Sequence, residues 1–192
     1  MKHFLYIALL LLPLSIQAQT RPAPGLRLHY YGYWLFHPGV QAAWEQPLWQ
    51  HVREKRGKRE GQIWHSLYAA PQLTCYAHRK NHYGIAPGLE AGYQATRRKG
   101  FEYQVFISGS YLLTLLANPV WEQQPDGSFA RKRLAGRGSF MPGGGISLGQ
   151  NLWKTGKAPL AWSVRLLFTQ PYQATSVLTP NGSLGIRYYF SR

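Results

Sequence analysis

The stretch FEYQVFISGSYLLTL, residues 101–115, decides the fold because apolar and polar side chains alternate along it. From Phe101 to Leu115 every second residue is apolar or glycine, and most of the residues between them are polar. Successive side chains of a β-strand point to opposite faces, so a period of two indicates one apolar and one polar face. A helix would need apolar residues three and four positions apart. Residues 101–115 are therefore predicted to form one long β-strand.

The same alternation recurs along the rest of the chain. It is clear at residues 83–95, 140–152, 160–169 and 183–190, and weaker at 26–36, 40–50 and 62–77. Short polar turns at 97–100 and 153–158 join neighbouring strands. The longer connections 117–137 and 170–181 fall on the opposite side, and 125–127 (Pro-Asp-Gly) is a predicted hairpin tip. The pattern predicts eight antiparallel strands, with both chain ends on the side of the short turns.

Two features leave the early topology open. The charged segment 51–61 is predicted as a loop, yet it falls on the side of the short turns. A turn is expected at His37-Pro38-Gly39, where proline and glycine interrupt the pattern. Residues 26–36 are interpreted either as the first strand or as a plug, and the strand count changes with that choice.

The first 18 residues have the form of a secretory signal peptide. Lys2 and His3 give a basic start, residues 4–14 are almost wholly apolar, and Ala18 offers a small residue for cleavage. The alternative is a buried N-terminal helix, which the following Gln-Thr-Arg-Pro disfavours. After Ala18 no apolar run approaches the roughly 20 residues of a transmembrane helix. We expect a signal peptide at 1–18 and one domain at 19–192, which could span a membrane only as a β-barrel.

Alternation alone does not distinguish a soluble β-sandwich from a membrane barrel. The residues opposite the apolar face are mostly small and uncharged, with many glycines and serines. The exposed face of a sandwich would carry many Lys and Glu, whereas a narrow barrel lumen needs small residues where side chains converge. The sequence therefore favours an all-β fold, namely an eight-stranded antiparallel transmembrane up-and-down β-barrel.

Charged residues are few on the face assigned to the lumen, and the two signs balance. An unpaired charge in a narrow interior would be costly, so a closed network of ion pairs is predicted, although an even split of six charges also arises by chance. The members of this lumen ion-pair network are three arginines and three glutamates: Arg27, Glu45, Glu90, Glu102, Arg165 and Arg187.

The chain as a whole is strongly basic, with 22 Lys and Arg against 7 Asp and Glu and a formal net charge of +15. The basic clusters are predicted to lie in the connections and not on the strands. They are 53–59, 79–80, 97–99 and a basic rim of Arg131, Lys132, Arg133 and Arg137. At a membrane surface such charge suits lipopolysaccharide phosphates or anionic headgroups, or serves only solubility and orientation. A nucleic-acid partner is not expected for an exported barrel.

The last strand resembles the terminal signal of outer-membrane barrels, which the barrel-assembly machinery reads during biogenesis. The matching residues are a polar residue, a glycine and two aromatic residues: Ser183, Gly185, Tyr188 and Phe190. The chain departs from that signal because Ser191-Arg192 follow the last aromatic residue. Over residues 26–190 the chain resembles the small outer-membrane β-barrel proteins of OmpA/OmpX-like architecture, notably at 33–39 and 90–94. The resemblance implies a fold and a location in the outer membrane of a Gram-negative bacterium, but no activity.

His65 and Ser66 are the first catalytic candidates, because lipid A deacylases of this architecture use a His/Ser pair. The two residues are adjacent, so on a strand they point to opposite faces and cannot meet. Glu90 and Glu102 could approach across the lumen as a general acid/base pair, but the nearby arginines favour a structural salt-bridge network. No catalytic residue is therefore predicted.

Metal and redox chemistry have no better support in the sequence. His78 and His82 could share a metal ion around one connection, but no third ligand accompanies them. Cys75 is the only cysteine and is interpreted as an apolar strand residue. We predict no metal and no cofactor.

The favoured function is a non-enzymatic outer-membrane barrel with a lumen filled by side chains. Its basic loops, chiefly 117–137 and 170–181, would contact envelope glycolipid such as lipopolysaccharide, or a partner protein. One alternative is an enzyme that modifies lipid in the outer leaflet, similar to a lipid A deacylase. Another is a secreted soluble β-protein. The sequence identifies neither a ligand nor an oligomeric state.

Overall fold

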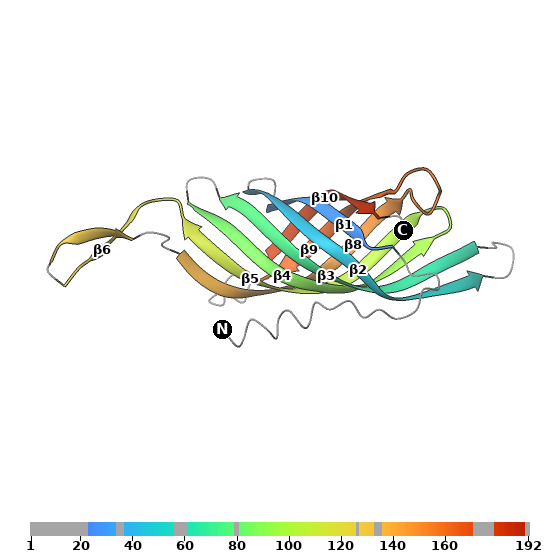
Figure 1. Ribbon diagram of the computed structural model, residues 1–192, viewed down its shortest axis with the longest axis horizontal. Helices are drawn as coiled ribbons and strands as arrows, with labels where there is room; N and C mark the ends of the chain where they lie inside the picture. The colour runs from blue at the N-terminus through green and yellow to red at the C-terminus, as the bar shows by residue number, and fades with distance from the viewer. Residues whose placement is uncertain are drawn as a thin grey trace.

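The chain folds into one closed antiparallel β-barrel. The computed structural model describes residues 23–33, 37–55, 61–78, 81–125, 127–132, 136–170 and 179–190, and within these ranges the regular structure is all strand (Figure 1). Hydrogen-bonded neighbours follow the order β1–β2–β3–β4–β5–β8–β9–β10, and β10 pairs with β1 to close the circle. Within the same ranges no helix is long and apolar enough to cross a membrane. The predicted all-β, eight-stranded up-and-down barrel is confirmed, whereas the predicted signal peptide at 1–18 lies outside the described residues.

The barrel strands are β1 (Gly25–Tyr33), β2 (His37–Lys55), β3 (Gly61–His78), β4 (His82–Arg97), β5 (Phe101–Leu116), β8 (Gly136–Asn151), β9 (Leu160–Thr169) and β10 (Thr179–Tyr189). Two further strands, β6 (Val120–Gln123) and β7 (Phe129–Lys132), pair only with each other. They form a hairpin, here called the distal arm (residues 120–132), that extends away from the barrel on the left of Figure 1. The predicted hairpin in the connection 117–137 is thus confirmed.

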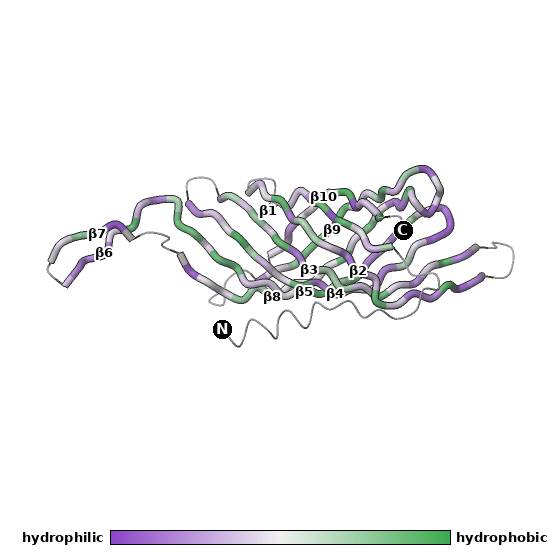
Figure 2. The backbone as a smooth tube through the Cα atoms, in the orientation of Figure 1, coloured by the Kyte–Doolittle hydropathy of each residue, from purple (hydrophilic) through white to green (hydrophobic). Residues whose placement is uncertain are grey.

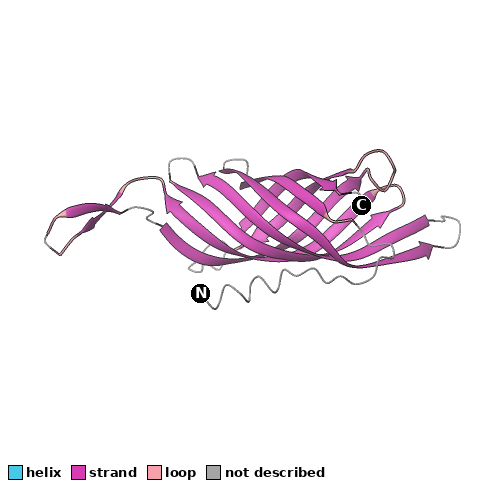
Figure 3. Cartoon of the chain, viewed as in Figure 1, coloured by secondary structure: helices cyan, strands magenta, loops and turns pink. Residues whose placement is uncertain are grey.

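The two ends of the barrel differ. At the terminal rim β1 begins and β10 ends, β2 ends and β3 begins, and the described connections 98–100 and 152–159 join neighbouring strands. At the distal rim β1, β3, β5 and β9 end and the barrel strands that follow them begin, and the distal arm lies between β5 and β8 in the chain. Successive strands run in opposite directions between these two rims around the whole barrel (Figure 3). Both termini of the barrel therefore lie at one end, as an even number of up-and-down strands requires.

The structure settles the early topology, and one expectation there was wrong. Residues 25–33 pair with β2 on one side and with β10 on the other, so they are the closing strand of the barrel and not a plug. The turn expected at 37–39 is part of β2, because Pro38 and Gly39 pair with Gly32 and Tyr31. Proline is tolerated in a strand where its missing N–H is not needed by a neighbour.

The basic clusters do not all lie in connections, which corrects the expectation that they lie outside the strands. Arg53 is on β2, Arg97 ends β4, Arg131 is on β7 and Arg137 is near the start of β8. The described part of the segment 51–61 is strand, since β2 runs to Lys55 and β3 starts at Gly61, with a register shift between Pro47 and Trp49. These strands continue past the barrel wall, where both faces meet water, so the two-residue alternation that revealed the other strands is lost.

The barrel has a polar interior and an apolar outer surface. Among the described residues, 22 buried residues are polar or charged and 12 are hydrophobic. The outward positions of the same strands carry exposed Leu, Ile, Val and aromatic side chains, for example Ile107 at 70% and Leu184 at 57% exposure. Hydropathy therefore switches residue by residue along the backbone in Figure 2. The face that the sequence marked as apolar is the outside of the barrel.

Large rings fit inside the narrow barrel because each covers a glycine on the next strand. The directly paired partners are Tyr68 with Gly92, Tyr76 with Gly84, Phe106 with Gly145, and His29 with Gly185. A Cβ atom at any of these glycines would meet the ring that now covers it. Ring and glycine thus share the space that two ordinary side chains would need, which is the arrangement in which an aromatic residue compensates for a strand glycine.

We expect Gly185→Ala to destabilise the barrel by about 1–3 kcal/mol, the usual cost of overpacking a tight interior. The added methyl group would meet the Leu28 carbonyl oxygen and the His29 ring. Gly182→Ala is the matched control on the same strand, because a Cβ atom there has no neighbour within 4 Å. The measurement is the urea midpoint of the chain refolded in detergent, and equal midpoints for the two variants would contradict this packing.

Candidate functional site

The six charged residues assigned to the lumen all lie in the interior, each on a different strand. Their exposure ranges from 1% to 4%, so water does not screen them. The arginines come from β1, β9 and β10, and the glutamates from β2, β4 and β5. Alternation aims these side chains inward from all sides of the barrel, which brings together residues up to 160 positions apart, from Arg27 to Arg187.

Five ion pairs join the six residues into one chain of alternating sign. From one end to the other it runs Arg165, Glu90, Arg27, Glu45, Arg187, Glu102. The nitrogen–oxygen distances along it are 2.6, 2.9, 3.4, 3.1 and 2.8 Å. Every internal member has a partner of opposite sign on each side, which is the arrangement that compensates best for the loss of hydration.

The two remaining barrel strands are bonded to the same network by polar side chains. The Tyr68 hydroxyl on β3 donates to the Glu90 carboxylate at 2.9 Å. The Asn151 amide on β8 donates to Glu102 at 3.3 Å and to the Tyr189 hydroxyl at 2.7 Å. All eight strands of the barrel therefore contribute to one connected set of interior hydrogen bonds and ion pairs.

Further side chains fix each end of the charge chain. Arg187 donates to the Gln94 carbonyl at 3.2 Å, and the Gln94 amide donates to Glu102 at 2.8 Å. At the other end Arg165 donates to Gln41 at 3.1 Å, and its guanidinium lies 3.9 Å from the centre of the Phe106 ring. Such contacts hold the guanidinium groups in one geometry, which strengthens charge-assisted hydrogen bonds in a dry interior.

This arrangement does not present the two glutamates as an acid/base pair. Glu90 is held between Arg27 and Arg165, and Glu102 is held by Arg187, Gln94 and Asn151. A general acid or base must reach the reacting atom of a substrate, and both carboxylates are at most 2% exposed. The network cross-links the strands across the barrel interior and fills the lumen.

A buried His/Ser cluster lies beside the network and was missed by the sequence analysis. The His29 ring contacts Ser183 Oγ at 3.2 Å and Ser163 Oγ at 3.3 Å, through its two nitrogens. These serines lie on β10 and β9, distant from His29 in the sequence, so no local pattern of residues on one strand indicates the cluster. All three residues are buried in the barrel interior, at 7% exposure or less.

The structure separates His65 from Ser66 and places His78 opposite His82. His65 lies on the outer face with its ring bonded to the Tyr93 hydroxyl, whereas Ser66 is buried in the interior, as alternation predicted. His78 and His82 are cross-strand partners with ring centres 5.0 Å apart. Within the described ranges no group of three His, Cys, Asp or Glu residues could hold a metal ion.

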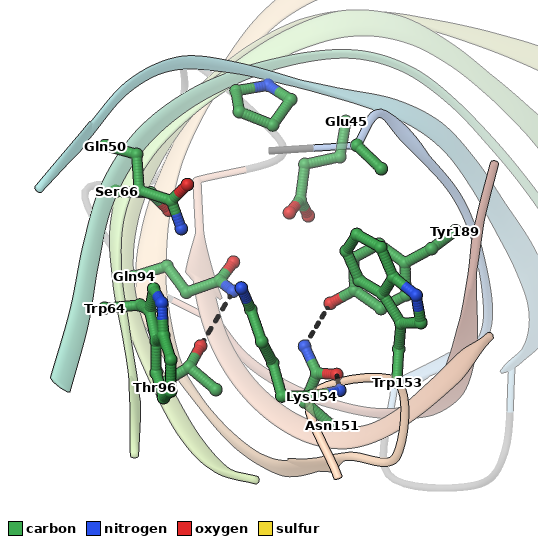
Figure 4. Close-up of a pocket in the computed structure, with 12 residues that line it drawn as sticks. Glu45, Gln50, Trp64, Ser66, Gln94, Thr96, Asn151, Trp153, Lys154 and Tyr189 are labelled. Atoms are coloured by element: carbon green, nitrogen blue, oxygen red, sulfur yellow. Dashed lines mark hydrogen bonds between the residues drawn. The ribbon is translucent and has the colours of Figure 1, made fainter. Parts of the chain in front are cut away.

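At the terminal rim the lumen ends in a small polar pocket, which Figure 4 shows with its lining side chains. The pocket has a volume of about 30 Å³, room for roughly two water molecules. Glu45, Gln94 and Asn151 line it on the network side. It is the end of the packed interior at the terminal rim.

The turn between β8 and β9 covers this pocket. The Trp153 ring stacks on Tyr189 at 4.9 Å, and the Lys154 ammonium lies 4.8 Å from the centre of the Trp64 ring (Figure 4). Partial burial lowers the pKa of Lys154 from its ordinary value. The Asn151 side chain accepts a hydrogen bond from the Lys154 backbone N–H at 3.0 Å, which fixes the turn. The Lys154 cation thus lies against the Trp64 and Trp153 rings at the terminal end of the lumen.

The residues matched to the barrel-assembly signal divide between the two faces of β10. Ser183 and Gly185 face the interior, where both contact His29. Tyr188 and Phe190 face outward, and Phe190 packs against Trp44 with ring centres 5.1 Å apart. The polar residue and the glycine of this motif therefore have a packing role of their own.

The basic rim is spread over two places at the distal rim. Arg131 is exposed on the distal arm, where Lys132 ends β7, and Arg137 is exposed near the start of β8. Arg133 lies outside the described residues. The predicted basic rim is therefore divided between Arg137, near the start of β8, and Arg131 on the arm that projects beyond it.

Comparisons with known proteins give no relative for this chain. No protein-family model, no curated protein and no solved structure matches it.

We expect Arg187→Glu to destabilise the barrel far more than Arg131→Glu. The first change places a third carboxylate beside Glu45 and Glu102, and leaving a buried charge unpaired costs about 3–5 kcal/mol. The second change reverses a charge that is exposed on the distal arm, where the effect should be within about 0.5 kcal/mol. Urea unfolding in detergent measures both, and similar midpoints would show that the ion-pair chain contributes little.

Proposed function

We propose that the chain is a non-enzymatic outer-membrane β-barrel protein of a Gram-negative bacterium. Its lumen is sealed, and its basic segments outside the membrane contact envelope glycolipid or a partner protein. The observation that carries the proposal is the inversion of the barrel, with charged residues buried inside and large apolar residues exposed on every strand. In water such a surface would aggregate, whereas in lipid it is the favourable one.

The outer surface supports this location because its side chains are layered. Aliphatic residues such as Leu89, Ile107 and Leu184 occupy the middle of the strands, and on β5 Leu113 and Leu116 continue the apolar surface toward the distal rim. Exposed aromatic rings lie toward both ends: Trp44, Phe101, Trp162 and Tyr188 near the terminal rim, and Tyr30, Tyr83, Tyr111, Phe140 and Phe168 toward the distal rim. Two aromatic girdles around an apolar band are typical of barrels in the outer membrane, where the rings sit at the headgroup level.

A sealed lumen supports a role other than conduction. The ion-pair chain crosses the interior, Phe106 and Tyr68 are at most 2% exposed beside it, and the Trp153–Lys154 turn covers the terminal rim. An eight-stranded barrel is just wide enough to be filled by side chains, so no continuous water path is expected. Function is therefore expected on the surfaces at the two rims.

The last strand is proposed to serve assembly as well as packing. Tyr188 and Phe190 present aromatic rings to the outside of β10, as the terminal signal of outer-membrane barrels does. The barrel-assembly machinery is thus a proposed partner during biogenesis, together with lipopolysaccharide and lipid in the mature state.

The expressed full chain should fractionate with the outer membrane and migrate faster on a gel when the sample is not heated. Closed barrels resist the detergent at room temperature because every barrel strand is paired on both sides. Reconstituted into a planar bilayer, it should give no discrete conductance steps. A chain that is freely soluble without detergent would favour the secreted β-protein, and stable channel openings would contradict the sealed lumen.

The alternative of a lipid-modifying enzyme is tested by the lipid itself. Expression of the chain should leave the lipid A mass spectrum unchanged, with no difference among the wild type, His65→Ala, Ser66→Ala and Glu90→Gln. His65 and Ser66 lie on opposite faces, and Glu90 is bound to two arginines. A new lipid A species that disappears in one of these variants would instead support the enzyme.

A further inference from the structure

The distal arm has one face that combines aromatic rings with a cation. Directly paired residues share a face, so Trp121 lies with Arg131, and Gln123 with Phe129. Trp121 is 60% exposed and Phe129 is 67% exposed. The opposite face carries Val120, Glu122 and Ala130. Both aromatic residues of the arm are therefore on the face that also bears Arg131, here called the aromatic face (Trp121, Gln123, Phe129, Arg131).

The arm holds this face in a defined register. At its tip the Gln124 N–H donates to the Ser128 carbonyl at 2.8 Å, and the Gly127 N–H donates to the Gln124 carbonyl at 2.9 Å. Gly127 has a φ of 83°, a conformation that other residues adopt only with strain. The closed tip fixes which residues face each other, so the two rings and the guanidinium stay on one side of the ribbon.

A two-stranded ribbon this short buries little surface of its own, and it is marginally stable in isolation. The exposed aromatic residues of such a ribbon are not explained by its own packing. A contiguous apolar patch with polar neighbours marks an interaction site. The distal arm lies apart from the barrel in Figure 1, so the barrel wall does not cover this face.

The order of side chains along the barrel indicates what the aromatic face meets. On β5 the rings of Tyr111 and its partner Phe140 are followed by the exposed Leu113 and Leu116, then by the exposed Asn118, and then by the arm. Lipid tails would end near Leu116, and headgroup phosphate would lie at the level of Asn118. The rings of the arm begin at Trp121, five residues beyond Leu116, so they lie outside the tails and are placed to contact sugars.

We infer that the aromatic face binds phosphorylated sugar of the outer leaflet, the headgroup of an acidic glycolipid such as lipopolysaccharide. This inference rests on the proposed function, because it requires the distal rim to face the cell exterior. The C–H face of a sugar ring packs on Trp121 and Phe129, and Gln123 donates and accepts hydrogen bonds at its edge. Arg131 pairs with a phosphate on the sugar, since a guanidinium matches phosphate oxygens in geometry and charge.

The test uses the full chain folded in detergent and three probes. The first probe is soluble core oligosaccharide from lipopolysaccharide, freed of lipid and bearing its phosphates. The second is the same oligosaccharide after phosphatase treatment, and the third is a vesicle of phosphatidylglycerol, which offers phosphate without sugar. Titration calorimetry or thermophoresis gives the affinity for each probe.

Trp121→Ala and Arg131→Ala should each weaken binding of the phosphorylated oligosaccharide about tenfold. Trp49→Ala is the matched control, because Trp49 is 50% exposed but lies at the terminal rim. It should bind as the wild type does. Removing the phosphates should weaken binding by the wild type and abolish the effect of Arg131→Ala, while Trp121→Ala should still reduce the remaining affinity.

Three outcomes of the titrations would overturn the inference. These are no binding of either oligosaccharide, equal affinities for Trp121→Ala and Trp49→Ala, or vesicle binding as tight as sugar binding with the same loss in Arg131→Ala. Capture of a protein through the aromatic face with no affinity for sugar would also overturn it. Heat-modifiable migration of each variant checks that the barrel is intact. Failure to fractionate with the outer membrane would remove the proposed function, whereas failure of the titrations alone would remove only this inference.

Discussion

The neutralisation of charge inside a narrow, dry tube is the constraint on which this structure depends. A single unpaired carboxylate or guanidinium in such an interior would cost several kcal/mol. The barrel meets this constraint with an alternating chain in which Glu90, Arg27, Glu45 and Arg187 each contact two opposite charges. The geometry requires strands from all sides of the barrel at once, so the network defines the closed shape as much as the backbone pairing does.

The inversion of polarity explains the other choices in the sequence. Because the interior is filled with long polar side chains, the strands need glycine and serine at the positions where these side chains converge. Tyr68 can lie across Gly92 and still donate to Glu90 only because no Cβ atom is present under the ring. On the outside there is no such crowding, and the same strands carry their bulkiest residues there.

The sequence predicted the barrel and the members of the charge chain, since both depend on local alternation. A period of two assigns a face to each residue, and the face assignment alone selected Glu45 and Arg165 for the interior. The face assignment could not predict which interior residues contact each other, because these contacts depend on the stagger of strands that are distant in sequence. The His29 cluster with Ser163 and Ser183 and the hydrogen bond from Tyr68 are products of that stagger.

Where alternation ends, prediction from the sequence failed. Residues 51–55 extend β2 beyond the barrel wall, where both faces are exposed, so the alternation that would indicate a strand is absent from the sequence there. The Trp153–Lys154 cap belongs to a turn, and no periodic pattern marks a turn residue that folds back over a lumen. The exposed aromatic face of the distal arm is likewise set by the register of a hairpin of two four-residue strands, which the sequence alone leaves undefined.

The order of the interior charges along the chain has a consequence for how the protein is made. Read from the N-terminus the signs are one positive, three negative and two positive, because Arg165 and Arg187 come after all the glutamates. A chain built only as far as β5 therefore holds three interior carboxylates and one guanidinium. Such a partial sheet is discouraged from curling shut on itself, and the final two strands carry the counter-charges that make closure favourable. The interior charges are therefore balanced only when the last strands are present and β10 pairs with β1.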